Sequence, residues 1–270
     1  MSAPVITFLS DYGLDDDFAG VCHAVIAGLC PDARVIDLTH GVPRHDVRAG
    51  ALILRGALPY APVGIHLAVV DPDVGAERRA VALRTGDGRL MVGPDNGLLS
   101  LAAESCGGVV EAVDIAHSPF RLEPVSATFH GRDIFAPVAA QLAAGKALGD
   151  AGEPVDAARL TVLALPQPQV RDGTLIAHAL YVDRFGNVQL NAGHEDLAEL
   201  GLKLGHRVEF GVGSSGPYQA QYVRTFAEVD PDQLLIYEDA YRTLAIAISR
   251  GSAAARLGLS VDDELRIKPA

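Results

Sequence analysis

The first half of the chain alternates short apolar segments of strand type with longer segments of helix type. Strand candidates lie at residues 5–10, 34–39 and 66–70, and helix candidates at residues 16–33 and 46–61 separate them. Strands and helices in this repeated order form a largely parallel sheet with helices packed on it. The pattern therefore predicts a layered α/β domain with a mostly parallel sheet.

The pattern changes near residues 160–175, where Pro166 and Pro168 interrupt the chain and helical periodicity nearly vanishes. Strand candidates separated by turns follow at residues 174–182, 206–212, 219–226, 234–238 and 243–249. We expect two domains, an α/β domain over residues 1–165 and a smaller antiparallel β-barrel-like domain over residues 170–270.

Charge and cysteine content exclude several classes of protein. The 270 residues carry a formal net charge of −12, which repels nucleic acid and anionic membrane surfaces. The apolar runs are too short to span a membrane, and the N-terminus lacks a basic leader. Three cysteines show no metal-binding spacing and cannot all pair with one another. We expect a cytoplasmic protein that binds neither nucleic acid nor membrane.

Charged residues crowd the end of the buried-strand candidate at residues 66–70. Asp71 ends the strand, Pro72 starts a turn, and Arg78 follows far enough along for the chain to reverse and bring its guanidinium back. An ion pair that pins the loop is the structural alternative. Because desolvating such charges is costly unless they are paired or used, we favour a functional site.

Asp11 follows the first strand candidate, at the edge where open α/β sheets bind ligands. The nearby Asp15, Asp16 and Asp17 fit the first turn of a helix, where acidic residues interact favourably with the helix dipole.

An aspartate after the first strand, such as Asp11, also suggests a phosphatase of the haloacid-dehalogenase type. Such an enzyme requires a second carboxylate two residues after the nucleophile. Gly13 occupies that position, which weakens the phosphatase hypothesis.

Two further polar clusters stand beside predicted elements. His130 precedes Gly131 and a helix candidate, where a titratable ring and backbone donors can meet a small polar group. Asp183 follows a strand, and Gly186-Asn187 is typical of a hairpin turn. The amide of Asn187 can also contact an adenine edge.

Taken together, these segments resemble the S-adenosylmethionine hydroxide adenosyltransferase family, the hydrolytic relatives of fluorinating and chlorinating enzymes. The resemblance covers nearly the whole chain, because "FLSDYG", "VIDLTHGVPRHDVRAGA", "VVDPDVG", "VGPDNGLLS", "FHGRD", "DRFGNV", "TFAEV" and "LAIAISRGSAA" occur in the family order. This order is far more specific than any single segment.

The resemblance implies that Asp71, Arg78 and His130 form the catalytic group. In halogenating relatives a tyrosine replaces the residue at Asp71 and the histidine is also replaced. Fluorinating members carry a serine at the position of Gly131, whereas chlorinating members have glycine there. By residue type, this chain matches the members that use water as the nucleophile.

The resemblance also assigns substrate contacts: Asp11 to the ribose hydroxyls, Asp183 to the methionine ammonium, and Asn187, Phe226 and the segment 249–252 with Ser252 to adenine. Two segments depart from the family pattern. Asp73 stands where glycine is expected, and residues 238–244 lack the Ser-x-Gly pattern that helps to hold the methionine carboxylate. Arg242 could supply that charge instead.

The resemblance implies conversion of S-adenosylmethionine and water to adenosine and methionine, with no metal or cofactor, because a sulfonium leaves unaided. It further implies a homotrimer whose sites combine the large domain of one subunit and the small domain of the next. Two alternatives stay open: a binding module for adenosine or S-adenosylmethionine without turnover, and a chloride-using halogenase. Asp71 disfavours the halogenase, because a fixed carboxylate repels an incoming anion.

Overall fold

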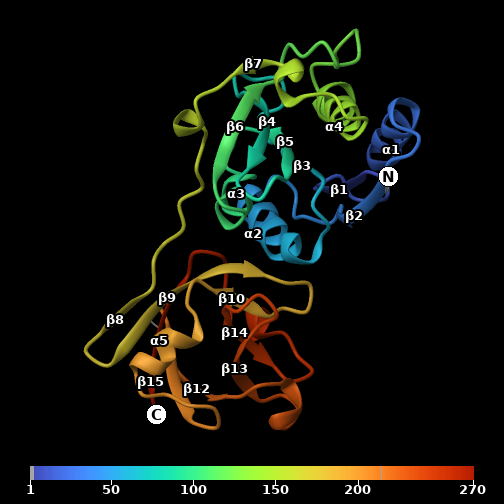
Figure 1. Cartoon of the computed structure of the whole chain (residues 1–270). Helices are drawn as coiled ribbons and strands as arrows, with labels where there is room; N and C mark the ends of the chain where they lie inside the picture. The colour runs from blue at the N-terminus through green and yellow to red at the C-terminus, as the bar shows by residue number, and fades with distance from the viewer. Residues whose placement is uncertain (1–2, 214) are drawn as a thin grey trace. The chain divides into compact units, whose positions relative to one another are not determined.

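The computed structural model describes residues 3–213 and 215–270 and divides into two compact units, Met1–Leu163 and Ala164–Ala270 (Figure 1). Each unit has its own sheet and its own hydrophobic core. Within these ranges, no helix combines the length and the apolar character needed to cross a bilayer.

The first unit is built on a seven-stranded sheet in the order β2-β1-β3-β5-β4-β6-β7 (Figure 1). Its strands are β1 (Val5–Ser10), β2 (Arg34–Thr39), β3 (Ile65–Val69), β4 (Ala80–Thr85), β5 (Leu90–Pro94), β6 (Val109–Asp114) and β7 (Glu153–Pro154). Strands β2, β1, β3 and β5 pair in parallel, whereas β4, β6 and β7 join the sheet in antiparallel pairs.

Helices pack on this sheet in two pairs, α1 with α4 and α2 with α3 (Figure 1). Their bounds are α1 (Phe18–Leu29), α2 (Val47–Ala57), α3 (Ser100–Ser105) and α4 (Ala136–Ala143). Strand β1 is buried along nearly its whole length, and its Ile6 and Phe8 join the core beneath α1 and α4. Burial over the whole strand is typical of a parallel strand inside an α/β sheet.

The parallel register places two segments of interest next to each other. Ser10 at the end of β1 is in register with Val69 at the end of β3, so the loops that begin with Asp11 and Val70 leave neighbouring strands at the same edge. Ligands bind at this carboxyl edge in open α/β sheets.

The second unit contains a closed barrel of seven strands, β9-β10-β14-β13-β12-β11-β15, in which β15 returns to pair with β9. Its strands are β8 (Gln169–Arg171), β9 (Thr174–Val182), β10 (Val188–Leu190), β11 (Arg207–Val212), β12 (Ser215–Tyr222), β13 (Leu234–Glu238), β14 (Leu244–Ile248) and β15 (Glu264–Pro269). Strand β8 extends the sheet beyond β9. All pairs are antiparallel except β12 with β13.

The predicted fold class is confirmed: a layered α/β unit precedes a smaller β-barrel unit. The parallel part of the first sheet is limited to four strands. The second unit also contains two short helices that periodicity did not predict, α5 (His194–Glu199) and α6 (Ala253–Leu257). Helices of five or six residues are too short to establish a periodic pattern.

Candidate active site

Asp71 and Arg78 form a buried ion pair at the carboxyl edge of the first sheet. Arg78 donates from Nε to Asp71 Oδ1 over 2.8 Å and from Nη2 to Oδ2, and the two side chains are only 9% and 6% exposed. The loop between them turns at Gly75, whose φ of +83° favours glycine. A Cβ on Gly75 would also lie 2.6 Å from the Ala127 carbonyl oxygen. The predicted chain reversal therefore brings the guanidinium back to Asp71.

His130 is the third member of this cluster. It stands just before a π-helical turn at Gly131–Phe135 that leads into α4. Arg78 Nη2 donates to His130 Nδ1 over 2.9 Å. Burial lowers the pKa of His130, and the Arg78 cation lowers it further, although Asp71 acts in the opposite direction. The imidazole is therefore neutral near pH 7, with Nδ1 accepting and the proton on Nε2.

The neighbours of His130 in the "FHGRD" segment have structural contacts. Arg132 Nε donates to Asp133 Oδ1 over 2.6 Å, and Asp133 Oδ2 accepts from the Ser126 amide over 2.8 Å. Asp133 is buried, so its charge depends on these partners. This pair holds the loop before His130 and does not join the Asp71 cluster.

Asp11 follows β1, and its Oδ2 accepts from the His45 amide over 2.9 Å. Tyr12 lies beside Gly131, so close that a Cβ on Gly131 would be 2.0 Å from Tyr12 Oη. Burial raises the pKa of Tyr12 well above its usual value, so its phenol stays neutral. Residue 131 must therefore be glycine as long as the Tyr12 ring lies where it does, because any side chain there would clash with the ring.

A single cavity of about 380 Å³ joins these residues. Asp11, Asp71 and His130 all line it, together with Tyr12, Asp16, Phe18, Arg44, His45, Val69, Val74, Thr128, Phe129 and Gly131. Within the described residues, Arg78 contacts Asp71 and His130 but does not line the cavity. Asp73 is exposed and does not line it either.

Sequence reasoning missed several of the lining residues, among them Arg44, His45 and the aromatic pair Phe18 and Phe129. Arg44 and His45 follow β2 at the same edge as Asp11, so their position after a strand was an available signal. His45 has a φ of +66°, a conformation that is uncommon for a non-glycine residue and that sequence does not indicate.

In the second unit, Asp183 and Asn187 form a closed turn between β9 and β10. Asp183 Oδ1 accepts from the Asn187 amide over 2.9 Å, and Asn187 Nδ2 donates to Asp183 Oδ2 over 2.8 Å. The turn packs on Ser252, because a Cβ on Gly186 would lie 2.0 Å from Ser252 Oγ. Ser252 itself caps α6 by accepting from the Ala255 amide over 3.1 Å.

Phe226 belongs to a different segment of the second unit, a short 3₁₀ turn at Phe226–Glu228, and contacts other groups. It is 37% exposed, its ring packs on Tyr237 with centroids 4.9 Å apart, and its carbonyl accepts from Ser249 Oγ over 3.3 Å. The structure therefore links Asp183, Asn187 and Ser252 directly, and links Phe226 to the segment before Ser252.

The unusual segment at residues 238–244 is held by Asp239. Its Oδ2 accepts from Gln189 Nε2 and Thr243 Oγ1, both over 2.9 Å. Arg242 pairs with Glu238 over 2.8 Å, and its side chain is 84% exposed. The cation of Arg242 thus already has a carboxylate partner.

Comparison with known proteins supports one family over both units. Residues 6–152 match the family model of the SAM hydroxide adenosyltransferase N-terminal domain. Residues 177–266 match the model of the C-terminal domain of the same family. An (R)-S-adenosyl-L-methionine hydrolase from Salinispora tropica is 50% identical over 98% of this chain and 97% of its own length. A fluorinase from Nocardia brasiliensis is more distant, at 26% identity over 98% of this chain and 97% of its own.

A solved structure gives the same answer for the fold. The crystal structure of an uncharacterized conserved protein from Thermotoga maritima matches with a TM-score of 0.90 and 36% identity, covering 97% of this chain and 99% of that one. The chain belongs to the S-adenosylmethionine hydroxide adenosyltransferase family.

Proposed function

We propose that this protein hydrolyses S-adenosyl-L-methionine to adenosine and L-methionine by attack of water at C5′ of the ribose. The observation that carries the proposal is that Asp71 and His130 line one cavity with Asp11 and are joined by Arg78. The hydrolase from Salinispora tropica, at 50% identity, supports the same reaction.

The reaction needs an oriented nucleophile more than it needs an acid. The oxygen of water bonds to C5′, the bond from C5′ to sulfur breaks, and its electron pair neutralises the sulfonium to give the thioether of methionine. The water proton passes to a carboxylate. Because the leaving group departs as a neutral thioether, the main contribution of the protein is alignment of water, carbon and sulfur.

We assign the proton to Asp71 and a donor role to His130. Nδ1 of His130 accepts a hydrogen bond from Arg78, so the neutral ring carries its proton on Nε2. Through Nε2 the ring can donate a hydrogen bond to the attacking water or to the product hydroxyl. Asp71 has a further lone pair on each oxygen and can accept from water while Arg78 fixes its orientation. In this proposal Arg78 is a positioning residue, because it contacts Asp71 and His130 but does not line the cavity.

We propose that Asp11 binds the ribose diol, since a carboxylate offers two acceptor oxygens to two hydroxyls. Asp183 for the methionine ammonium, and Asn187, Phe226 and Ser252 for adenine, are proposed from the family resemblance. A homotrimer with sites completed by a neighbouring subunit is proposed on the same basis. The division of these candidate residues between two compact units supports that assembly.

We further propose that catalysis requires no metal or cofactor and that the protein works in the cytoplasm. The chemistry supports the first point, because a sulfonium needs no Lewis acid to leave. Three free and buried cysteines support a reducing compartment. Activity that falls on exhaustive chelation and returns with magnesium would contradict the metal-free proposal.

Identification of the products in ¹⁸O-labelled water tests the proposed reaction. We expect adenosine and methionine, with the label in the 5′-hydroxyl of adenosine, because the new bond joins water oxygen to C5′. Unchanged S-adenosylmethionine would indicate a binding module, and 5′-chloro-5′-deoxyadenosine at high chloride would indicate a halogenase. The named relative also specifies the (R) form, so both sulfonium diastereomers should be tested separately.

A further inference from the structure

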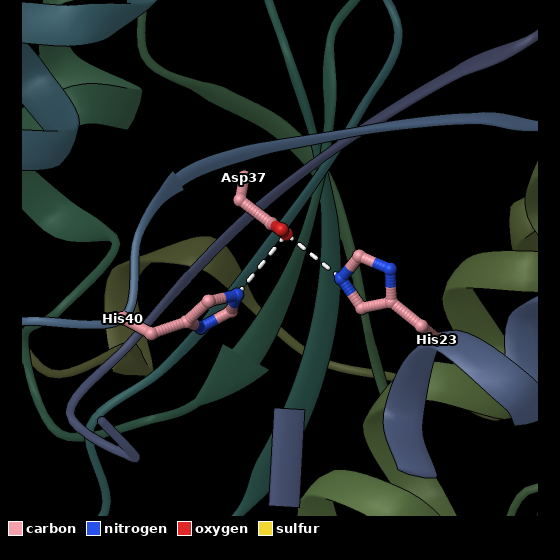
Figure 2. Close-up of side chains that lie close together, drawn as sticks. All are labelled: His23, Asp37 and His40. Carbon is pink, nitrogen blue, oxygen red and sulfur yellow. Dashed lines mark hydrogen bonds and ion pairs between the residues drawn. The ribbon is translucent and has the colours of Figure 1, made fainter. Parts of the chain in front are cut away.

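Two histidines and an aspartate converge in the first unit, outside the cavity described above. His23 comes from α1, Asp37 from β2, and His40 directly follows β2 (Figure 2). His23 Nε2 and Asp37 Oδ1 form a hydrogen bond of 2.8 Å, and His40 Nε2 lies 3.0 Å from the same oxygen. One nitrogen from each ring and one carboxylate oxygen lie within 4.8 Å of one another.

His40 shows that this cluster is more than a pair of ordinary ionic contacts. Its side chain is 2% exposed, and its Nε2 has no hydrogen-bond partner among the described residues. Asp37 Oδ1 is close enough but lies outside the direction that a hydrogen bond requires. A buried, unpartnered ring nitrogen is costly, so something else is expected to satisfy it.

A metal ion satisfies such a nitrogen where a hydrogen bond does not. Metal ligands point at the ion and not at one another, which fits His40 Nε2, near Asp37 Oδ1 but not aligned with it. His23 and Asp37 form a hydrogen bond, which the ion would replace. With bonds of about 2.0–2.1 Å, neighbouring ligand atoms of a tetrahedral zinc ion are roughly 3.3 Å apart. The observed separations from Asp37 Oδ1 are a few tenths of an ångström shorter, and His23 and Asp37 are partly exposed and able to adjust.

The other ring nitrogen of His40 is already anchored. His40 Nδ1 lies 2.7 Å from Ser10 Oγ, and the ring packs edge-on against Phe8 with centroids 4.7 Å apart. Metal-binding histidines characteristically fix their second nitrogen by a hydrogen bond, which sets the ring orientation and the tautomer. Ser10 and Phe8 therefore preorganise Nε2 toward the cluster.

We propose that His23, Asp37 and His40 bind one divalent transition-metal ion of the zinc class. Two imidazole nitrogens and one carboxylate oxygen suit such ions and do not suit calcium or magnesium. The side chains of His23 and Asp37 are 35% and 42% exposed, which leaves an entry path and a position for water.

The ion would link α1, through His23, to the end of β2, through Asp37 and His40. It would also stabilise the loop that carries Asp11, because Ser10 and His40 hold that loop by hydrogen bonds. Ser10 Oγ accepts from the Tyr12 amide over 3.3 Å, and the His40 carbonyl accepts from the Gly13 amide over 2.7 Å. The site lies apart from Asp71, Arg78 and His130, so its role is structural and compatible with metal-free chemistry. Loading it should change stability more than turnover.

Cobalt titration of the tag-free full chain, stripped with chelator, tests the site. We expect visible absorption that saturates at one equivalent per chain and that zinc displaces. His23→Ala and Asp37→Ala should weaken cobalt binding roughly tenfold or more, because each removes a ligand. His194→Ala, an exposed histidine of the second unit, is the matched control and should bind like wild type.

Thermal unfolding provides a second readout that needs no substrate. Zinc should raise the Tm of the wild type and of His194→Ala, and should leave that of His23→Ala unchanged. If the wild type binds no cobalt, or if binding and the Tm rise persist in both ligand variants, the cluster is an ion-pair network and the proposal is wrong. Neither result depends on whether the chain hydrolyses S-adenosylmethionine.

Discussion

Arg78 donates from Nη2 to Nδ1 of His130 over 2.9 Å. Arginine has no acceptor, so this contact determines which nitrogen of the neutral ring carries the proton. Burial and the same guanidinium lower the pKa of His130. The contact therefore makes His130 a hydrogen-bond donor through Nε2 and leaves Asp71 as the proposed proton acceptor.

Removing the guanidinium tests this arrangement. Arg78→Met should lower kcat by about 10²–10³, the scale seen when an oriented catalytic group is lost, and should change KM much less. The pKa of His130, followed by NMR titration of the ring, should rise, because a cation that lowers it is gone. Arg79→Met is the control, since Arg79 pairs with Asp95 instead. An unchanged pKa of His130 would contradict the link between Arg78 and His130.

Asp71→Asn separates charge from shape. The amide retains the size and part of the hydrogen bonding but cannot take a proton from water, so kcat should fall by about 10²–10³. Affinity for substrate should change little. Asp73→Asn alters an exposed carboxylate two residues away and should keep wild-type activity. A near-normal rate for Asp71→Asn, measured by adenosine release, would mean that Asp71 only positions water.

Asp11→Ala tests the ribose contact. Affinity for adenosine, measured by calorimetry, should weaken by roughly 1.5–3 kcal/mol for each charge-assisted hydrogen bond lost. Asp15→Ala is the matched control, because Asp15 is exposed and does not line the cavity within the described residues. Equal affinity of the Asp11 variant and the wild type would remove Asp11 from the site.

The contact between Gly131 and Tyr12 predicts coupled effects. Gly131→Ala places a Cβ 2.0 Å from Tyr12 Oη and 3.0 Å from Cζ, so the ring must move into the cavity or the helix must shift. Activity should fall clearly. Adding Tyr12→Phe to Gly131→Ala removes the hydroxyl oxygen that lies nearest the new Cβ, so the double variant should recover part of the activity. Activities of the wild type, the two single variants and the double variant form a double-mutant cycle that measures this coupling. If the effects of the two substitutions on activity are additive, residue 131 and Tyr12 do not clash as described.

Several parts of the site could be predicted from local pattern. Strand β1 has the predicted bounds, and the ends of β1 and β3 place Asp11 and Asp71 at one edge. The return of Arg78 was also predicted, because Pro72 and Gly75 indicate a turn of sufficient length. These features could be predicted because the periodicity of apolar residues indicates strands and helices, and Pro and Gly indicate turns, within a few residues of sequence.

Other parts depend on tertiary contacts that no short pattern encodes. The left-handed conformation of His45, the π-helical turn at Gly131–Phe135 and the approach of Tyr12 to Gly131 are set by packing between distant segments. The cluster of His23, Asp37 and His40 combines a helix, a strand and a loop. Its spacing matches no metal motif, so the sequence alone gave no reason to group these residues.

His66 provides a prediction about stability and pH. It is fully buried in β3, where Thr7 Oγ1 lies 2.8 Å from Nδ1 and Arg89 Nη1 lies 3.4 Å from Nε2. Burial, and then the Arg89 cation, lower the pKa of His66 from 6.5 to about 4. As the pH falls from 6.5 toward 4, the unfolded chain takes up a proton that the folded chain does not.

The stability contributed by neutral His66 is thus complete above pH 6.5 and is lost as the pH falls toward 4. At about 1.4 kcal/mol per pH unit, the loss across this window is on the order of 3 kcal/mol. Urea unfolding followed by circular dichroism from pH 7 to pH 4.5 should show this slope in the wild type. His66→Asn should be less stable at pH 7 and should lose less stability on acidification, because asparagine does not titrate. Parallel pH dependences for the two proteins would show that other groups cause the acid sensitivity.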